Sequence, residues 1–309
     1  MRVGVDIGGT KIHAVLVDDA GAVVHQVRLP TGFGPTVVLE TAAESVRSLA
    51  RLAGVETASF ATVGVGIPGA VDSDTGRVSH AVNLGLEGLE LGRELGTLLG
   101  LPVRVENDVN AAAVGAFRLL DRPLEQSMAY LNLGTGLAAG LVLAGRLWRG
   151  SRGTAGEIGH IPVDPNGPLC PCGQRGCLET VASGSGVARQ WPSDHPSPVH
   201  ALFEAAAAGD ARAVEVRDGL VRNVASAVRM LVLSVDVDTV VIGGGLSSLG
   251  DTLLVGVRGV LGTWAASSPF LASLDLPDRV ELVPSDFPAA AVGAALVGMT
   301  TTGDTPWQK

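Results

Sequence analysis

Two segments that lie far apart in the sequence follow one pattern. Asp6-Ile-Gly-Gly-Thr10 and Asn132-Leu-Gly-Thr-Gly136 each join an apolar stretch, a polar residue, a glycine turn and a second apolar stretch. Short apolar runs bounded by such turns are typical of β-strands. A pattern that occurs twice in one chain indicates a coarse internal duplication. We therefore predict an α/β fold in which two similar α/β lobes face a central cleft.

Apolar spacing and turn residues predict further elements around these two segments. Helical spacing, with Gly or Pro at the expected ends, predicts helices over 35–53, 88–100, 110–119, 197–233 and 288–299. Strands are expected at 22–28, 62–67, 103–106, 127–132, 137–143 and 238–242.

The length of the chain predicts two domains. A chain of 309 residues exceeds what one small hydrophobic core organises. We expect a smaller α/β lobe made of 1–118 together with a C-terminal helix at 289–309. We expect 119–288 to form a larger α/β lobe that carries a glycine-rich insertion with all the cysteines.

Charge and hydropathy argue against several classes of function. The chain has 31 acidic and 22 basic residues, a net charge of −9, so we expect no nucleic-acid partner. A phosphorylated small molecule is still allowed, because backbone N–H groups and Mg²⁺ can hold phosphates without a basic surface. Apolar stretches are too short or too interrupted to span a membrane, and the first residues do not resemble a signal peptide. We therefore expect a cytoplasmic protein without a membrane partner.

The three cysteines of the chain form a compact group in the sequence. They occur in Cys170-Pro-Cys172-Gly-Gln-Arg-Gly-Cys177, and His160 precedes them by ten positions. Three thiolates and one imidazole match the ligand set of a closed, structural Zn²⁺ site. Three ordinary buried or paired cysteines are the alternative, although a disulfide would leave one thiol over. Four protein ligands leave no open position for water, which argues against a zinc hydrolase.

The two glycine turns suit the binding of phosphate groups. Glycine lets backbone N–H groups approach phosphate oxygens, and Asp6 could hold Mg²⁺ through water. A lone hairpin turn would mean little, so the interpretation rests on both turns together. Gly64-Val-Gly-Ile-Pro-Gly69 fits the dinucleotide fingerprint by spacing only, because the residues that follow do not open a helix. We interpret it as a loop at a cleft wall.

Several acidic and glycine residues are candidates for ligand contacts. Asn107-Asp108 lies at a predicted strand-to-helix junction, where it is either a simple N-cap or places Asp108 as a general base. Glu157 and Glu179 flank the metal ligands and suit hydrogen bonds to sugar hydroxyls, or else they only support the ligands. The glycines from 243 to 245 follow a predicted strand. They form either a plain turn or a space for a purine ring.

These residues together resemble the ROK family of sugar kinases and sugar-responsive repressors. The matching motifs are Asp6-Ile-Gly-Gly-Thr-Lys11, Val105-Glu-Asn-Asp108, Glu157-Ile-Gly-His160 and the cysteine segment through Cys177-Leu-Glu179. The resemblance implies the actin/hexokinase-like ATPase fold, a duplicated ribonuclease H-like core with ATP and sugar between two lobes.

The resemblance also implies roles for individual residues. Asp108 would be the catalytic base. The sugar would be bound by Gly69, Asn83, Asn107, Asp108, Glu157, His160 and Glu179. ATP with Mg²⁺ would be bound by Asp6, Gly8, Gly9, Thr10, Lys11, Gly134, Thr135, Gly136, Gly243, Gly244 and Gly245. Structural zinc would be held by His160, Cys170, Cys172 and Cys177.

The leading hypothesis is ATP-dependent phosphorylation of the 6-hydroxyl of a hexose, most simply glucose. Kinases for N-acetylglucosamine, N-acetylmannosamine or fructose are alternatives, and so is a non-catalytic sugar sensor. The sensor is favoured by one departure from the family pattern: the second turn continues as Leu137-Ala138-Ala139-Gly140, where the kinases usually have further glycines. Family repressors carry a helix-turn-helix domain ahead of the first glycine turn, and we expect none before residue 6. The family commonly forms dimers or tetramers, so a homodimer or homotetramer is expected.

Overall fold

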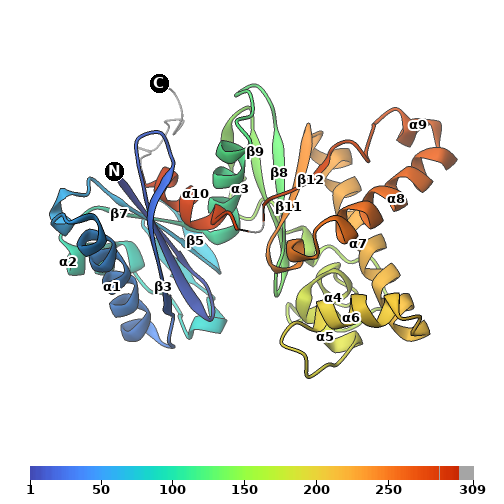
Figure 1. Cartoon of the computed structure of the whole chain (residues 1–309), viewed down its shortest axis with the longest axis horizontal. Coiled ribbons are helices and arrows are strands. Elements are labelled where there is room, and N and C mark those ends of the chain that lie inside the picture. Colours follow the sequence, from blue (N-terminus) through green and yellow to red (C-terminus); the bar gives the residue numbers. More distant parts are fainter. Residues whose placement is uncertain (285, 299–309) are drawn as a thin grey trace. The chain divides into compact units, whose positions relative to one another are not determined.

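We describe a computed structural model of the chain, in which residues 1–284 and 286–298 are placed (Figure 1). The described residues form two compact units. The first unit contains Met1–Glu125, Gly140–Ala155 and the residues from Pro288 to the end of the described range. The second contains Gln126–Ala139 and Gly156–Phe287. The sequence division placed all of 119–288 in one lobe and 289–309 in the other. That lobe assignment stays a prediction, and residues 299–309 lie outside the described range.

The first unit is built on a five-stranded sheet with the order β3-β2-β1-β4-β7. Strands β1, β2 and β3 are antiparallel neighbours, whereas β4 is parallel to β1 and β7 is parallel to β4. The bounds are β1 Arg2–Ile7, β2 Lys11–Val17, β3 Val23–Pro30, β4 Val63–Ile67 and β7 Val103–Asn107. The parallel strands therefore end together, at one edge of this sheet, with Ile7, Ile67 and Asn107.

A second five-stranded sheet has the order β10-β9-β8-β11-β12. Its bounds are β8 Met128–Leu133, β9 Leu137–Leu143, β10 Arg146–Trp148, β11 Thr239–Gly243 and β12 Val280–Leu282. Strand β10 is antiparallel to β9, while β11 is parallel to both β8 and β12. In chain order both sheets read third, second, first, fourth, fifth. The duplication expected from the two glycine turns is confirmed, and each turn joins the first two strands of its sheet.

Helices cover both faces of the first sheet. Alternate residues of β1 point to opposite faces and contact different helices. Val3, Val5 and Ile7 belong to a buried cluster with the apolar face of helix α1. On the other face, a side chain at Gly4 would collide with the backbone of α10. The first unit contains α1 Pro35–Ala53, α2 Leu91–Leu99, α3 Asp108–Leu119 and α10 Ala289–Val297 (Figure 1).

Helices α3 and α10 pack with their backbones in close approach. A Cβ at Gly293 would overlap the carbonyl of Ala111, and one at Gly115 would overlap the carbonyl of Ala289. Glycine at these positions lets the two helices meet without side chains between them. Because α3 begins directly after β7, this packing fixes the start of the helix against the sheet.

The second unit contains most of the remaining helices. They are α4 Glu179–Ala182, α5 Gly184–Gln190, α6 Pro198–Ala207, α7 Ala211–Val235, α8 Asp251–Ser267 and α9 Pro269–Ala272. The helices expected within 197–233 are α6 and α7, separated where Asp210 caps α7 by accepting from the backbone N–H of Ala213. Single 3₁₀ turns lie at Thr57–Ser59, Val82–Leu84, Ile158–His160 and Gly245–Leu249.

Other boundaries differ from the expected ones for local reasons. The helix expected at 110–119 begins at Asp108, because Asn107 is its N-cap, and the helix expected from 88 begins at Leu91. The hairpin of β5 Ala70–Asp72 and β6 Arg77–Ser79 was not expected, nor were β10 and β12, since three residues are too few for an alternation signal. Helix α8 was missed because Gly256, Gly259 and Gly262 lower its intrinsic helix propensity.

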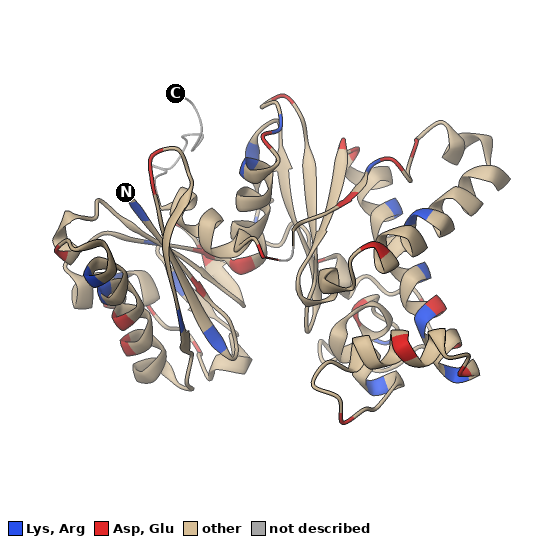
Figure 2. Cartoon of the chain, in the orientation of Figure 1, with Lys and Arg blue, Asp and Glu red and all other residues tan. Residues whose placement is uncertain are grey.

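Acidic and basic residues are interspersed along the helices (Figure 2). On α7, for example, Arg212 lies 2.6 Å from Glu215 and Arg217 lies 2.8 Å from Asp218. Among the described residues, none of the helices combines the length and the apolar character needed to cross a membrane.

Candidate active site and metal cluster

Two aspartates lie at the carboxyl edge of the parallel strands in the first unit. Asp6 is the penultimate residue of β1 and pairs with Gly66 of β4. Asp108 follows the last residue of β7, and a Cβ built on Gly66 would lie 3.5 Å from the Asp108 Cα. Gly66 therefore allows the start of α3 to approach the sheet beside Asp6. Ligands of open α/β sheets bind at this edge.

The two aspartates influence each other electrostatically. Burial and, to a smaller extent, the negative charge of Asp108 raise the pKa of Asp6 to about 7, against the opposing effect of Lys11. A carboxyl group in this environment gains from a nearby cation, because the cation offsets both the burial and the neighbouring charge. The expected role of Asp6 in holding Mg²⁺ is therefore chemically consistent with its surroundings.

The raised pKa of Asp6 predicts a pH-dependent effect of Asp6→Asn on stability. In the wild type, the folded state holds the Asp6 proton more tightly than the unfolded state. The resulting stability is complete below the unfolded pKa of 3.8 and is lost as the pH rises through about 7. Asparagine resembles the protonated acid and does not titrate. Without Mg²⁺, the free energy of unfolding of the variant should therefore exceed that of the wild type by up to about 4 kcal/mol at pH 8.

Urea unfolding of both proteins between pH 5 and pH 8 measures this difference. The difference in the free energy of unfolding between Asp6→Asn and the wild type should increase as the pH rises. Asp19→Asn, at an exposed position of the β2–β3 turn, is the control and should show no such trend. A constant gap for Asp6→Asn would contradict the raised pKa.

Asn107 is the N-cap of α3, and the simple capping role left open by the sequence is observed. Its Oδ1 accepts hydrogen bonds from the backbone N–H groups of Val109 at 2.9 Å and Asn110 at 3.2 Å. Its Nδ2 donates to the carbonyl of Gly69 at 3.3 Å. Gly69 has a positive φ of 104°, and a side chain there would meet the Ser79 carbonyl. The structure thus brings Gly69, Asn107 and Asp108 together.

A buried ion pair next to Asp108 was not expected from the sequence. Glu106 is 2% exposed, and its Oε2 lies 2.7 Å from both Nε and a terminal nitrogen of Arg149. Its Oε1 accepts from the backbone N–H of Asn107 at 3.0 Å and from Asn110 Nδ2 at 2.9 Å. No local pattern marks Arg149, which follows a three-residue strand. Glu106, between Val105 and the strand end in a strand expected to be part of the sheet, is the one signal that could have indicated a cationic partner.

The first glycine turn is braced from outside the motif by Thr31. The Thr31 hydroxyl donates to the carbonyl of Gly8 at 2.6 Å, and its backbone N–H donates to the carbonyl of Thr10 at 3.2 Å. Gly9 and Thr10 are exposed at the tip, and the Cβ of Asn83 is 3.8 Å from where a Cβ on Gly9 would lie. The turn, Lys11 and Asn83 therefore occupy one region of the first unit.

The second glycine turn is held by the segment after the cysteines. The carbonyls of Gly134 and Thr135 accept from the backbone N–H groups of Gly184 at 2.8 Å and Ser185 at 3.1 Å. The third glycine segment lies beside this turn, because Gly243 pairs with Asn132 in the parallel β8–β11 ladder.

The glycines of the third segment differ in their surroundings. A Cβ at Gly243 would overlap the Tyr130 hydroxyl, and one at Gly244 would lie 2.6 Å from Asn132 Oδ1. Only Gly245 of these three faces open space. Gly243 and Gly244 therefore serve close packing, and of the three glycines Gly245 alone has open space beside it.

Glu179 contacts the second glycine turn directly. Its Oε2 accepts from the backbone N–H of Leu137 at 2.9 Å. A Cβ at Gly136 would lie 2.5 Å from the same oxygen, so this position must be glycine for the carboxylate to reach the turn. Glu157 is exposed in the same unit. The supporting role considered for Glu179 is thus present, and its other oxygen can still bind a ligand.

Ala138 and Ala139, which stand where the family's kinases usually have glycines, differ in the exposure of their methyl groups. Successive residues of β9 point to opposite faces. Ala139 is 2% exposed and its backbone N–H donates to the carbonyl of Gly156 at 2.8 Å. Ala138 is partly exposed. Of the two methyl groups, only that of Ala138 is accessible to a ligand, since the Ala139 methyl group is buried.

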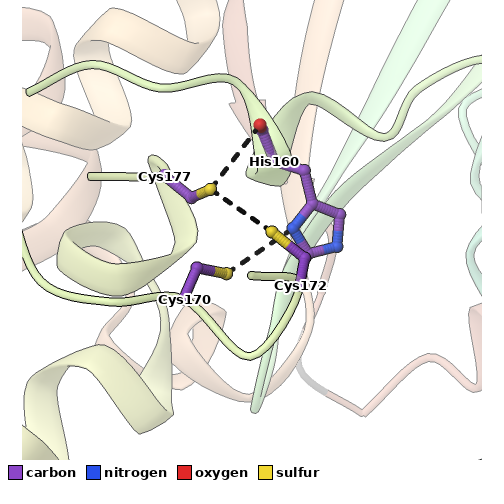
Figure 3. A group of neighbouring side chains, drawn as sticks. All are labelled: His160, Cys170, Cys172 and Cys177. Carbon is purple, nitrogen blue, oxygen red and sulfur yellow. Dashed lines mark hydrogen bonds between the residues drawn. The ribbon is translucent and has the colours of Figure 1, made fainter. Parts of the chain in front are cut away.

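His160, Cys170, Cys172 and Cys177 converge on one point (Figure 3). Their ligand atoms all lie within 4.8 Å of one another. Cys172 Sγ is 3.6 Å from Cys177 Sγ, and Cys170 Sγ is 3.7 Å from His160 Nδ1. A tetrahedral zinc site with bonds of about 2.3 Å to sulfur has sulfur–sulfur edges near 3.8 Å. The four side chains fit this geometry, and the three cysteines are not disulfide-bonded.

The thiols of this cluster differ in acidity. Hydrogen bonds from the backbone and side chain of Gln174 lower the pKa of Cys172 to about 6, so this residue is a thiolate at neutral pH. Burial, together with hydrogen bonding to its neighbours, raises the pKa of Cys177 to about 12. A metal ion binding here would displace the proton from Cys177, as expected for a cation that coordinates thiolates. His160 Nδ1 faces the sulfurs, which leaves Nε2 for another partner (Figure 3).

The expected site residues therefore fall into two groups. The first unit holds Asp6, the turn from Gly8 to Lys11, Gly69, Asn83, Asn107 and Asp108. The second unit holds the turn from Gly134 to Gly136, the glycines from 243 to 245, Glu157, Glu179 and the four clustered side chains of Figure 3. Sequence patterns missed the roles of Thr31, Glu106 and Arg149. Thr31 and Arg149 act on Gly8 and Glu106 from distant positions, whereas Glu106 directly precedes Asn107, to which it is bonded.

The sequence and the fold are similar to those of known sugar kinases. The profile of the ROK family matches residues 2–297. A glucokinase from Halalkalibacterium halodurans is 36% identical over 277 residues, which is 83% of this chain and 83% of that protein.

Two solved structures extend this similarity to the fold. A ROK hexokinase from Thermus thermophilus matches with a TM-score of 0.79 and 34% identity, covering 96% of this chain and 97% of that one. A ROK family glucokinase from Streptomyces griseus, solved with glucose and AMPPNP, matches with a TM-score of 0.80 and 30% identity, covering 96% and 98%.

Proposed function

The chain belongs to the ROK family, and on that premise we propose that it is an ATP-dependent kinase that phosphorylates the 6-hydroxyl of glucose. Its fold is the actin/hexokinase-like ATPase fold, with mixed α/β sheets. The observation that carries the proposal is the 33–36% identity to glucokinases over more than four fifths of the chain. The pair of aspartates at the carboxyl edge of the first sheet supports a phosphoryl-transfer chemistry.

In the first unit we assign the catalytic role to Asp108. Its carboxylate accepts the proton of the sugar hydroxyl while the hydroxyl oxygen bonds to the γ-phosphorus and the bond to ADP breaks. The start of a helix that is pinned against the sheet holds this carboxylate in a fixed place. Asn107, Gly69 and Asn83 are assigned to the sugar hydroxyls. The hydrogen bond between Asn107 and Gly69 supports placing these two residues at one subsite.

ATP and Mg²⁺ are assigned to the glycine turns and Asp6. In the first unit Asp6 would hold the cation, and the turn from Gly8 to Lys11 would contact phosphate. In the second unit the turn from Gly134 to Gly136 would contact phosphate, and Gly243 to Gly245 would lie at the adenosine, with open space at Gly245. Mg²⁺ would supply positive charge to the transferring phosphoryl group.

In the second unit we assign structural zinc to His160, Cys170, Cys172 and Cys177, and sugar contacts to Glu157, His160 and Glu179. The tetrahedral spacing of the four ligand atoms supports the zinc assignment. A closed ligand set of this kind supports folding rather than chemistry. The metal would hold Glu179 in place, because only one residue separates it from Cys177. His160 would reach sugar through Nε2 once Nδ1 is bound to metal.

Release of ADP in a coupled assay tests the proposed reaction. Purified protein with ATP and Mg²⁺ is supplied in turn with glucose, N-acetylglucosamine, N-acetylmannosamine and fructose. We expect the highest kcat/KM with glucose. Preference for another sugar would correct the substrate, and binding of a sugar without any ADP release would replace the kinase by a sugar sensor.

We also propose a homodimer or homotetramer that acts in the cytoplasm. A reducing compartment suits the cluster, because the three thiols are free of disulfides and can bind metal. Light scattering of the purified protein measures its mass in solution. A mass equal to the 31.4 kDa chain would contradict the assembly.

A further inference from the structure

The carboxylate of Glu106 is buried beside the catalytic strand–helix junction but has no role in the proposed reaction. Its side chain is 2% exposed, and a buried carboxylate needs a cation or several hydrogen bonds to stay charged. Arg149 provides the cation, with two nitrogens at 2.7 Å from Oε2. The other hydrogen bonds found for Glu106 come from Asn107 and Asn110, at the junction of β7 and α3.

These bonds end on the residues that surround Asp108 in the chain. Oε1 of Glu106 accepts from the backbone N–H of Asn107 and from the side chain of Asn110, so it contacts the residue before Asp108 and the residue two after it. Asn107 in turn caps the helix through the N–H groups of Val109 and Asn110. These hydrogen bonds therefore form a network on both sides of Asp108 with Glu106 at its centre.

Arg149 connects this network to a different part of the chain. It directly follows β10, and its carbonyl accepts from the backbone N–H of Ala155 at 3.2 Å, which closes the loop 149–155. Both ends of the connection lie in the first unit. Rotation of the junction would have to break two short charge-assisted bonds to Arg149, whereas a helix cap alone offers only neutral bonds.

We propose that Arg149 is a positioning residue for Asp108, acting through Glu106. The guanidinium holds the Glu106 carboxylate, and that carboxylate holds the backbone at Asn107 and the side chain at Asn110, on both sides of Asp108. The inference rests on the proposed kinase function, because Asp108 must be the base for its orientation to matter. It predicts that loss of the arginine slows the chemical step more than it weakens ligand binding.

Arg149→Met removes the charge and keeps an apolar stem of similar length. Since small displacements of a reacting group can cost about 10²-fold, we expect kcat to fall roughly 10²-fold, with the KM values for glucose and ATP changed by less than about threefold. Arg149→Lys retains a cation, and its kcat should be about tenfold higher than that of Arg149→Met. Arg146→Met, at an exposed arginine of β10, is the matched control and should keep wild-type kcat.

Loss of Arg149 also leaves a buried unpaired carboxylate, which destabilises the fold by itself. The double variant Glu106→Gln with Arg149→Met removes that charge and keeps an acceptor for Asn107 and Asn110. Its thermal midpoint should return toward the wild-type value while its kcat stays low. A double variant with wild-type kcat would show that Arg149 only stabilises the fold, and wild-type kcat in Arg149→Met alone would equally overturn the proposal.

ADP release together with glucose binding, measured by calorimetry without ATP, separates a failure of the kinase function from a failure of the positioning role of Arg149. If the wild type releases no ADP with any sugar, the kinase function fails, and the positioning role of Arg149, which rests on it, fails with it. If the wild type is active and Arg149→Met is equally active, the kinase stands and the positioning role of Arg149 is rejected. If glucose affinity falls in parallel with kcat, Arg149 acts on binding and the positioning role is likewise rejected.

Discussion

Asp108→Asn is expected to bind glucose and ATP with near-normal affinity and to lose nearly all turnover. General-base catalysis contributes about 10²–10⁴-fold, and kcat should fall within that range. Asparagine has the size of aspartate, and its amide oxygen can still accept from the backbone N–H of Val109, as Asp108 Oδ1 does at 3.0 Å. The geometry of the helix start should therefore persist while the proton acceptor is lost.

Steady-state kinetics together with glucose calorimetry measures this effect. Asp121→Asn is the control, because Asp121 follows the other end of α3, is exposed, and has a positive φ of 47° that asparagine tolerates. The control should keep wild-type kcat. Turnover of Asp108→Asn within a few-fold of the wild type would remove Asp108 from the role of base.

Cys177→Ser is expected to release the metal and to weaken the binding of glucose strongly. Cys177 is buried, and its sulfur lies between Cys172 Sγ and the backbone carbonyl of His160, both at 3.6 Å. Glu179 follows it by two residues and holds the backbone at Leu137. Because metal binding and local folding are coupled, loss of the metal should free both Glu179 and the second glycine turn.

We expect the affinity for glucose to fall by roughly 10²-fold or more and the affinity for ATP to fall with it. Metal analysis by mass spectrometry should find one zinc per wild-type chain and none in the variant. Arg175→Ala, at an exposed position between Cys172 and Cys177, is the control and should keep both metal and binding. Full glucose phosphorylation by a zinc-free protein would contradict a structural role for the metal.

The elements predicted best are those with a strong local pattern. Helix α1 has the predicted bounds, because a regular apolar stripe and Pro35 at its start are both local signals. The two glycine turns indicated the duplication, and the equal strand orders of the two sheets confirm it. The clustering of His160 with the cysteines was likewise predicted, since close spacing in the chain limits how far the thiols can separate.

The contacts that orient these motifs were not predictable from local patterns. Thr31 reaches Gly8 across 23 residues, Glu179 reaches Leu137 across 42, and Arg149 reaches Glu106 across 43. A hydrogen bond between distant residues leaves no periodicity in the chain, because its partners are set by how strands and loops pack. Short strands such as β10 and β12 likewise form only when a neighbouring strand supplies their hydrogen bonds.

The local sequence was therefore sufficient to predict the chemical groups: the glycine turns, the aspartates at strand ends and the cluster of His160 with the three cysteines. Folding determined which of these groups are held in place and by what. Glu106 is an ordinary acidic residue in the sequence, and it becomes the centre of the Asp108 junction only because β10 brings Arg149 to it. The reason is physical: chain connectivity fixes which atoms are present, while burial and long-range packing fix their orientation and their charge.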